Sequence, residues 1–347
     1  MKVCLVGRYF NLKNAGMGRY SMTVRDELRK RGFGVVTVSE DDLDWISRKR
    51  FILGKYFVYT MFAVRGMIPK DCTVYHAMHV LEANWLPYGE KPTVVTVHDL
   101  IPVLYTHTLK THYANNPINT IISKKVFDFS LKRAQRADRV IAISNQVKEE
   151  LLSYAKYDPE KIVVIPNGIP DYLQPQEKED DVPRVGMLSY LDPRKRFDLL
   201  IEAYKQSKHE GELWIGGDTM DVQYKQHLLQ LAGNDPRIKF LGFVPVGKEG
   251  WFYSQLDAMI FTSASEGYGL PIVEALACGK PVVTLEDAII PEEVKEHTYV
   301  VSKKDLPAVI ENPPRVKKKD VEWAQKHRWS VVVDQIVEVY EDVIQGS

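Results

Sequence analysis

Short runs rich in valine and isoleucine alternate along this chain with longer amphipathic segments. Runs of this length without polar alternation are typical of strands that are buried on both faces of a parallel sheet. The segments between them, such as 18–31 and 146–155, have the apolar spacing of surface helices. The alternation predicts an α/β layered fold. In the first half of the chain, the predicted strands are residues 2–7, 34–39, 93–97, 139–144 and 161–166.

The pattern pauses once, at residues 166–184, which contain four prolines and an acidic run. Such a composition predicts an interdomain linker. Strand and helix patterns then alternate again, with the region around 198–207 as one of the helices. The predicted strands of the second half are residues 184–189, 212–217, 238–243, 258–263 and 281–286.

Two doubly wound, Rossmann-like domains that face each other across a cleft are therefore predicted. We expect a first domain at 1–168, a linker at 169–183, a second domain at 184–328 and a C-terminal segment at 329–347. The helix in this last segment is expected to pack back toward the first domain. Ligands of open parallel sheets lie outside the carboxyl ends of the strands, so we expect the site in the cleft.

Charge divides the chain in the same way, although the 347 residues have 46 basic and 46 acidic side chains and no net charge. Residues 1–170 contain 25 basic and 16 acidic side chains, whereas residues 171–347 contain 21 and 30. Overall neutrality argues against a nucleic-acid partner.

Three cysteines without a paired spacing argue against a disulfide framework or a zinc site and are typical of cytoplasmic proteins. No apolar stretch approaches the length of a membrane span, so only peripheral membrane contact is expected.

One loop carries most of the predicted chemistry. Glu266 and Glu274 flank Gly267 and Gly269, directly after the predicted strand 258–263. Pro271 and Gly279 suit the first and the C′ positions of a helix at 271–278. The free amides ahead of such a helix attract anions or sugar hydroxyls, and two carboxylates accept hydrogen bonds from a polyhydroxylated ligand. The alternative is a capping acid followed by an ordinary turn.

The sequence from Glu266 to Val283 resembles the signature of retaining glycosyltransferases of family 4, in which two glutamates are separated by seven residues. These enzymes have the two-domain GT-B fold. The resemblance extends to 161–169 at the end of the first domain, to 190–204 with its Pro-Arg-Lys loop, and to 240–267, which leads into the signature. It also includes the glycine-containing stretch 15–28 and the histidine-bearing stretch 93–102.

The resemblance implies roles for individual residues of the second domain. Glu266 and the backbone of the loop after it would hold the donor sugar, and Glu274 would bind the ribose hydroxyls. Lys195, with Arg194 beside it, would neutralise the departing diphosphate, although a solvated basic turn is the alternative. The position where many relatives carry arginine is Ser189 here. The loop that would hold the donor consists of Gly267, Tyr268, Gly269 and Leu270. The contacts to the base are expected near Phe243 and Val244.

In the first domain, Gly16 and Gly18 are expected between a strand and a helix, where the chain could approach a donor phosphate or simply turn. His98 ends a predicted strand, and the resemblance implies that it contacts the donor sugar. Asp99 either orients His98 or caps the following turn. His76 and His79 could line the acceptor side, or they could be core or surface histidines.

Together these features predict a retaining, metal-independent hexosyltransferase without a cofactor, which uses a GDP- or UDP-hexose, with mannose or glucose as the sugar. A sugar-nucleotide epimerase, a phosphorolytic enzyme and a non-catalytic sugar-nucleotide-binding protein are the alternatives on the same fold. The acceptor is expected to be anionic, a saccharide or lipid-linked. Two basic stretches, 45–70 and 124–139, either contact a membrane surface peripherally or are ordinary solvated helices.

Overall fold

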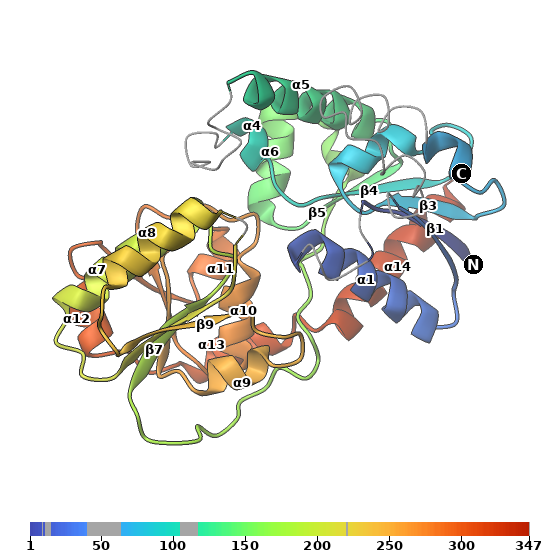
Figure 1. Ribbon diagram of the computed structural model, residues 1–347. Helices are drawn as coiled ribbons and strands as arrows, with labels where there is room; N and C mark the ends of the chain where they lie inside the picture. The colour runs from blue at the N-terminus through green and yellow to red at the C-terminus, as the bar shows by residue number, and fades with distance from the viewer. Residues whose placement is uncertain (9, 11–14, 40–63, 105–116, 220, 347) are drawn as a thin grey trace. The chain divides into compact units, whose positions relative to one another are not determined.

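The computed structural model describes residues 1–8, 10, 15–39, 64–104, 117–219 and 221–346. The chain divides into two compact units, coloured blue to green with a red C-terminal helix, and yellow-green to orange, in Figure 1. The first unit contains the described residues of 1–104 and 120–168 together with 329–347, and the second consists mainly of residues 169–328. The segment predicted as a linker, 169–183, groups with the second unit.

A six-stranded parallel sheet forms the centre of the first unit, with the order β2-β1-β3-β4-β5-β6. All five registers are parallel, as connections through helices require. The strands are β1 (Lys2–Val6), β2 (Gly34–Val38), β3 (Val74–Ala77), β4 (Thr93–Val97), β5 (Arg139–Ala142) and β6 (Ile162–Val164). The helices are α1 (Ala15–Lys30), α4 (Ile101–Leu104), α5 (Pro117–Ala134), α6 (Asn145–Ala155) and α14 (Trp329–Gln345), with 3₁₀ turns η3 (Val64–Met67), η4 (Val80–Trp85) and η7 (Pro159–Lys161).

The C-terminal helix α14 belongs to the core of this unit. Its apolar face packs with α1 and β1 around Val24, Leu28 and Ile336, all fully buried. Trp329 starts the helix against Gly168, where a Cβ atom would lie 2.4 Å from the indole ring. Gly168 is therefore needed for this close approach.

The second unit contains a second six-stranded parallel sheet, with the order β12-β11-β10-β7-β8-β9. Its strands are β7 (Arg184–Leu188), β8 (Glu212–Gly216), β9 (Ile238–Gly242), β10 (Ala258–Phe261), β11 (Val282–Leu285) and β12 (Tyr299–Val301). The helices are α7 (Phe197–Gln206), α8 (Val222–Ala232), α9 (Glu249–Ser254), α10 (Leu270–Ala277), α11 (Glu292–Lys295), α12 (Leu306–Glu311) and α13 (Lys318–Gln325), with the 3₁₀ turn η8 (Pro193–Lys195). Strands of both sheets that occupy central positions are buried on both faces, which explains their uniformly apolar sequences.

The predicted fold class and all ten predicted strands are confirmed, whereas β3 and β12 were not predicted. β3 contains a histidine within four residues, and β12 has only three residues, so neither forms an apolar run. Most of the stretch 45–70 lies outside the described residues. Within the described part of the chain, no helix is long and apolar enough to cross a membrane.

Candidate active site

The Pro-Arg-Lys loop of the second unit follows β7 and folds into the turn η8. Asp192 caps the turn by accepting a hydrogen bond from the amide of Arg194 at 2.9 Å, and Pro193 occupies the first helical position. This is the residue choice expected at a helix start. The cap and the proline therefore stabilise the conformation of this loop without a ligand.

Lys195 is buried, with 7% of its surface exposed, so it does not belong to a solvated turn. Its Nζ lies 2.5 Å from Oε1 of Glu266, and the guanidinium of Arg194 lies 3.5 Å from the same oxygen. Burial lowers the pKa of Lys195, although the Glu266 charge acts in the opposite direction. Burial acts to raise the pKa of Glu266, but the charges of Lys195 and Arg194 outweigh it and hold that pKa below its usual value. The site thus contains two cations and one carboxylate in a largely dry environment.

Backbone contacts fix this cluster to the loop that follows β10. Arg194 donates to the carbonyl oxygen of Ser265, and Arg196 donates to those of Thr262 and Ser263. The Thr262 hydroxyl in turn donates to the carbonyl oxygen of Lys195 at 2.9 Å. Two segments about seventy residues apart in sequence therefore form one rigid loop pair at the carboxyl edge of the sheet. No sequence pattern had pointed to Arg196 or Thr262.

Glu274 lies on α10, which begins one residue earlier than predicted, at Leu270. The helix is preceded by Gly269 at φ 94°, a left-handed conformation that favours glycine. Glu274 is buried and accepts a hydrogen bond from the Tyr253 hydroxyl of α9 at 2.9 Å. Tyr253 thus orients the carboxylate, and no local pattern in the sequence indicates this role.

The loop between Glu266 and α10 offers its backbone to a ligand more than its side chains. Tyr268 is 3% exposed, and its ring lies 6.0 Å from that of His327. Among the described residues, its hydroxyl has no hydrogen-bond partner. Gly267 has no side chain that would cover the neighbouring backbone. A sugar could therefore approach the backbone here, as expected for amides ahead of a helix.

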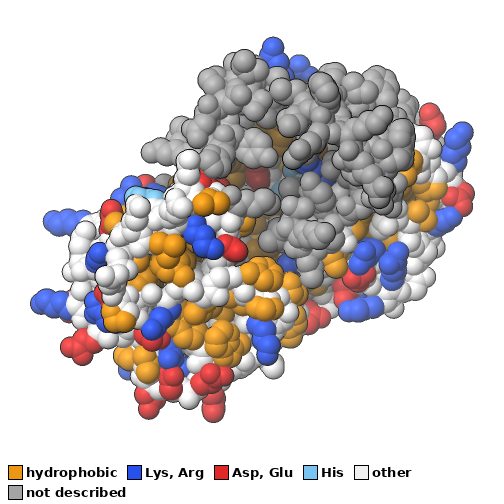
Figure 2. Space-filling view, viewed as in Figure 1, with side chains coloured by type: hydrophobic (Ala, Val, Ile, Leu, Met, Phe, Trp, Pro, Cys, Tyr) orange, Lys and Arg blue, Asp and Glu red, His pale blue; other side chains and the backbone are white. Residues whose placement is uncertain are grey.

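Phe243 and Val244 follow the edge strand β9. Phe243 is 61% exposed, whereas Val244 is buried. Hydrophobic side chains are visible on the surface of this unit among charges of both signs (Figure 2). An exposed aromatic ring at the carboxyl end of a strand offers a flat surface for a nucleobase.

His98 lies directly after β4 of the first unit and is buried. Its Nε2 lies 2.9 Å from the carbonyl oxygen of Met78, to which it donates, because a carbonyl can only accept. Burial lowers the pKa of His98 to about 4, so the ring is neutral and Nδ1 retains its lone pair. His98 can therefore accept a hydrogen bond from a hydroxyl group. The ring is held edge-on by Tyr20 at 4.7 Å and stacked by His79 at 5.8 Å.

The two other histidines that the sequence singled out, His76 and His79, have structural partners. His79 caps η4, because its Nδ1 accepts a hydrogen bond from the amide of Leu81. The His79 ring also stacks on that of His98. His76 is fully buried, with Nδ1 2.6 Å from the Tyr340 hydroxyl and Nε2 2.8 Å from the Thr96 hydroxyl. The expectation that His76 lines the acceptor side is wrong, because both of its ring nitrogens are occupied within the core.

Two further expectations concern Asp99 and the glycines near the N-terminus. Asp99 accepts a hydrogen bond from the amide of Ile101, so it caps the following turn. Gly16 and Gly18 do not lie between a strand and a helix. They lie in the first two turns of α1, which begins at Ala15, three residues earlier than predicted. Glycine is unfavourable in the interior of a helix, which is why a later start was expected, but α1 nevertheless includes both residues.

The fold and these loops define a class of protein: a GT-B glycosyltransferase. Sucrose-phosphate synthase from Thermosynechococcus elongatus has the same fold, with a TM-score of 0.77 and 18% identity over 100% of both chains. HepE of Anabaena, solved in complex with UDP and glucose, matches with a TM-score of 0.68 and 20% identity over 100% of this chain and 99% of its own. At these identities the likeness establishes the fold.

Sequence comparison then gives the family. The family model described as "Glycosyl transferases group 1" matches residues 169–319, and the model described as "Glycosyltransferase Family 4" matches residues 14–171. Together the two models match residues 14–319, so the chain is a glycosyltransferase of the kind that the resemblance had indicated.

The individual relatives have low sequence identity to this chain. The O-antigen chain mannosyltransferase RfbU of Salmonella typhimurium is 28% identical over 290 residues, which cover 81% of this chain and 75% of the relative. The GPI3 subunit of phosphatidylinositol N-acetylglucosaminyltransferase from Saccharomyces cerevisiae is 26% identical over 68% of this chain. This chain covers only 57% of that subunit.

Proposed function

We propose that this glycosyltransferase transfers a hexose from a nucleoside diphosphate sugar to a saccharide acceptor, with retention of the anomeric configuration. The observation that carries the proposal is the buried cluster of Lys195, Arg194 and Glu266 at the carboxyl edge of the second sheet. Two cations beside loop amides suit a diphosphate, and buried carboxylates suit sugar hydroxyls. The mannosyltransferase activity of the Salmonella relative supports mannose as the sugar, and the UDP bound to HepE of Anabaena supports a nucleotide as the carrier.

In this proposal the residues of the second unit bind the donor. Glu274, oriented by Tyr253, accepts hydrogen bonds from the ribose hydroxyls, and the base stacks near Phe243. The diphosphate displaces part of the Lys195–Glu266 interaction, which frees Glu266 to accept from the sugar. The backbone from Gly267 to Leu270 donates to the remaining sugar oxygens and phosphate oxygens.

His98 acts on the sugar from the first unit. Its neutral Nδ1 accepts a hydrogen bond from a sugar hydroxyl, while Met78 holds the opposite ring nitrogen. A ring fixed on both sides loses little entropy when it binds, so its contribution is orientation of the sugar. The proposed role of His98 is therefore to hold the donor sugar in the reacting geometry.

The reaction follows from the charges available. The bond between the anomeric carbon and the phosphate oxygen breaks as the acceptor oxygen attacks from the same face. The leaving diphosphate takes the acceptor proton, and Lys195 and Arg194 stabilise its developing charge. These cations supply the electrostatic stabilisation that a divalent metal ion supplies elsewhere, so we propose that transfer needs no metal ion. Glu266 is not assigned as a covalent nucleophile.

We assign the acceptor to the basic surface of the first unit. Lys124 and Lys125 of α5 are exposed. Arg133 of the same helix and Arg136 of the turn after it lie over the ring of Tyr88 at 5.3 Å each. A basic helix of this kind attracts an anionic saccharide or the headgroup of a lipid-linked acceptor. We propose a cytoplasmic enzyme that contacts the membrane at most peripherally.

The test is a panel of UDP-, GDP- and ADP-hexoses with mannose, glucose and galactose as sugars, in which release of the nucleoside diphosphate is followed with and without oligosaccharide acceptors. One donor should be consumed, with or without added magnesium and in the presence of a chelator. Proton NMR of the product should show the α-anomer from an α-linked donor. Consumption of no donor, or a product with inverted configuration, would contradict the proposal.

A further inference from the structure

A cavity of about 720 Å³ lies in the second unit, at the sheet edge opposite the donor loops. Its walls come from segments that precede β7, β8, β10 and β11 and from the stretch after α12. The residues assigned to the donor follow the carboxyl ends of the strands, so none of them lines this cavity. Its volume is that of a small-molecule site.

His209 is the buried polar group of this cavity. It is 6% exposed, and its Nε2 has no hydrogen-bond partner within the described ranges. Burial lowers the pKa of the His209 ring, although the backbone of Pro183 acts in the opposite direction, so the ring is neutral at pH 7. In the tautomer that carries its proton on Nδ1, the unpaired Nε2 is an acceptor. Arg237 fixes the backbone of His209 by donating to its carbonyl oxygen at 3.0 Å.

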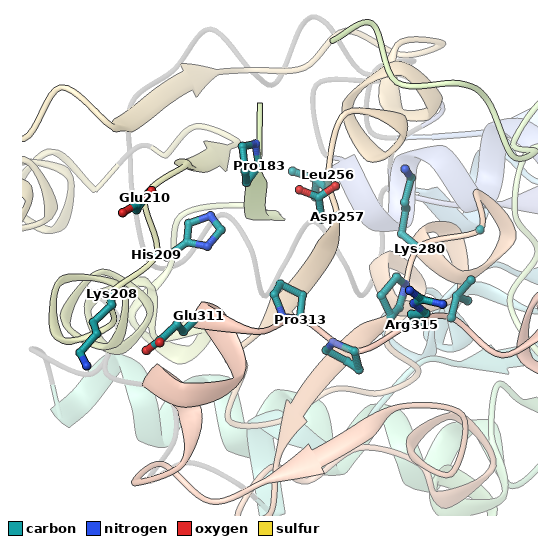
Figure 3. A pocket seen from close by; sticks show the side chains of 14 residues that line it. Pro183, Lys208, His209, Glu210, Leu256, Asp257, Lys280, Glu311, Pro313 and Arg315 are labelled. Atoms are coloured by element: carbon teal, nitrogen blue, oxygen red, sulfur yellow. The ribbon is translucent and has the colours of Figure 1, made fainter. Parts of the chain in front are cut away.

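Two cations lie on the other side of the cavity. Figure 3 shows Lys280 and Arg315 on one side, His209 and Glu210 on the other, and Pro313 between them. In the part of the chain that the structure describes, no hydrogen bond or ion pair occupies the side chains of Lys280 and Arg315.

Three carboxylates also line the cavity, those of Glu210, Asp257 and Glu311, and among the described residues none of them forms an ion pair with Lys280 or Arg315. Both oxygens of Asp257 lie within 2.9 Å of Nζ of Lys178, and one also accepts from the amide of Arg184 at 2.7 Å. Among the described residues, an anion that enters the cavity therefore meets two cations without close partners.

We propose that this cavity is a second ligand site, which binds a small saccharide that carries an anionic group. Lys280 and Arg315 bind the anion, and Nε2 of His209 accepts a hydrogen bond from a sugar hydroxyl. The flat apolar side of Pro313 packs against the carbon face of the sugar ring. A ligand with only one of these features would satisfy only part of the cavity, because burial of an unpaired acceptor costs free energy. The proposal does not depend on the identity of the donor.

The test is calorimetric titration of the full chain, with the donor site saturated by the nucleotide that it binds best or, if none binds, without nucleotide. The probes are glucose 6-phosphate, a uronic acid disaccharide, inorganic phosphate and free glucose. Glucose 6-phosphate should bind, and the double variant Lys280→Ala/Arg315→Ala should weaken it at least tenfold. His209→Phe should weaken glucose 6-phosphate severalfold but leave inorganic phosphate unchanged. Lys318→Ala, which removes an exposed lysine outside the cavity, is the matched control and should bind like wild type.

Binding of the disaccharide as well would identify a segment of an anionic glycan as the ligand, and binding of the phosphate monoester alone would identify a free sugar phosphate. Both results support the site. No binding of either probe at millimolar concentration would overturn it. Equal affinity for inorganic phosphate and glucose 6-phosphate, unaffected by His209→Phe, would reduce the cavity to a non-selective anion-attracting surface and would also overturn the proposal. Failure of the nucleotide sugars to bind would instead contradict the proposed donor site at the opposite edge of the sheet and would leave this proposal unaffected.

Discussion

Replacement of Lys195 by methionine tests whether the buried cluster of the second unit is a coupled charge pair. Methionine keeps most of the length and apolar volume of the lysine stem, so the change mainly removes the ammonium group. Glu266 would then retain only Arg194, 3.5 Å away, as a charged neighbour among the described residues. The matched change on the other partner is Glu266→Gln, and the double variant completes the cycle.

The expected change in the free energy of unfolding follows from the burial of both Lys195 and Glu266. Removal of one partner of a buried ion pair costs about 3–5 kcal/mol of unfolding free energy, because the other charge stays buried. Arg194 compensates part of this loss, so we expect about 3 kcal/mol for Lys195→Met. Glu266→Gln should cost about 1–2 kcal/mol, since a lysine whose pKa burial already lowers can lose its proton. The double variant should cost less than the sum by about 2 kcal/mol.

Urea denaturation of the four proteins at neutral pH, followed by circular dichroism, measures these differences. The same proteins are then titrated with the preferred nucleotide sugar, for which Lys195→Met should lower the affinity at least tenfold. Strict additivity of the two single changes would refute the coupled pair. A stability change without a change in donor affinity would refute the role of Lys195 at the diphosphate.

Three further predictions concern groups that orient the site. Tyr253→Phe should raise the KM for the donor about fivefold with little change in kcat, because it removes one hydrogen bond worth about 1 kcal/mol from Glu274; unchanged donor kinetics would contradict this. His98→Ala should lower kcat more than it raises the donor KM, since the ring orients the bound sugar; an effect on KM alone would contradict it. Burial lowers the pKa of His76 to about 3 from 6.5, so the unfolded chain binds an extra proton as the pH falls below 6.5. The unfolding free energy should therefore fall by roughly 2 kcal/mol from this group between about pH 7 and pH 5, and His76→Gln should remove that share in urea titrations at the two pH values; an unchanged pH dependence would contradict it.

Much of the fold could be predicted because central parallel strands must be apolar on both faces. The run at 93–97 is fully buried as β4, and the helix predicted at 271–278 is present as α10, shifted by one residue to 270–277. The strand β3 escaped prediction because His76 interrupts its apolar pattern, although its partners Thr96 and Tyr340 make it compatible with a core. Such compensation joins residues that are distant in sequence and leaves no local signal.

The site was predictable where one loop carries the chemistry and not where distant segments meet. Glu266 and Glu274 stand in one short stretch, so their pattern could be read directly. The contact of Lys195 with Glu266 joins residues 71 positions apart, and that of Tyr253 with Glu274 joins residues 21 positions apart. Burial converts Lys195 from a basic residue of a turn into half of an ion pair, and burial depends on the packing of the whole unit.

The most direct test of the proposed function is calorimetric titration of the wild-type protein and of Glu274→Gln with UDP- and GDP-hexoses. Glu322→Gln, which changes an exposed glutamate of the same unit, is the control. We predict that one nucleotide sugar binds to the wild type and to the control alike, and that Glu274→Gln binds it at least tenfold more weakly, a difference of about 1.4 kcal/mol. Absence of binding of any nucleotide sugar at millimolar concentration, or equal affinity in all three proteins, would contradict the placement of the donor at this loop.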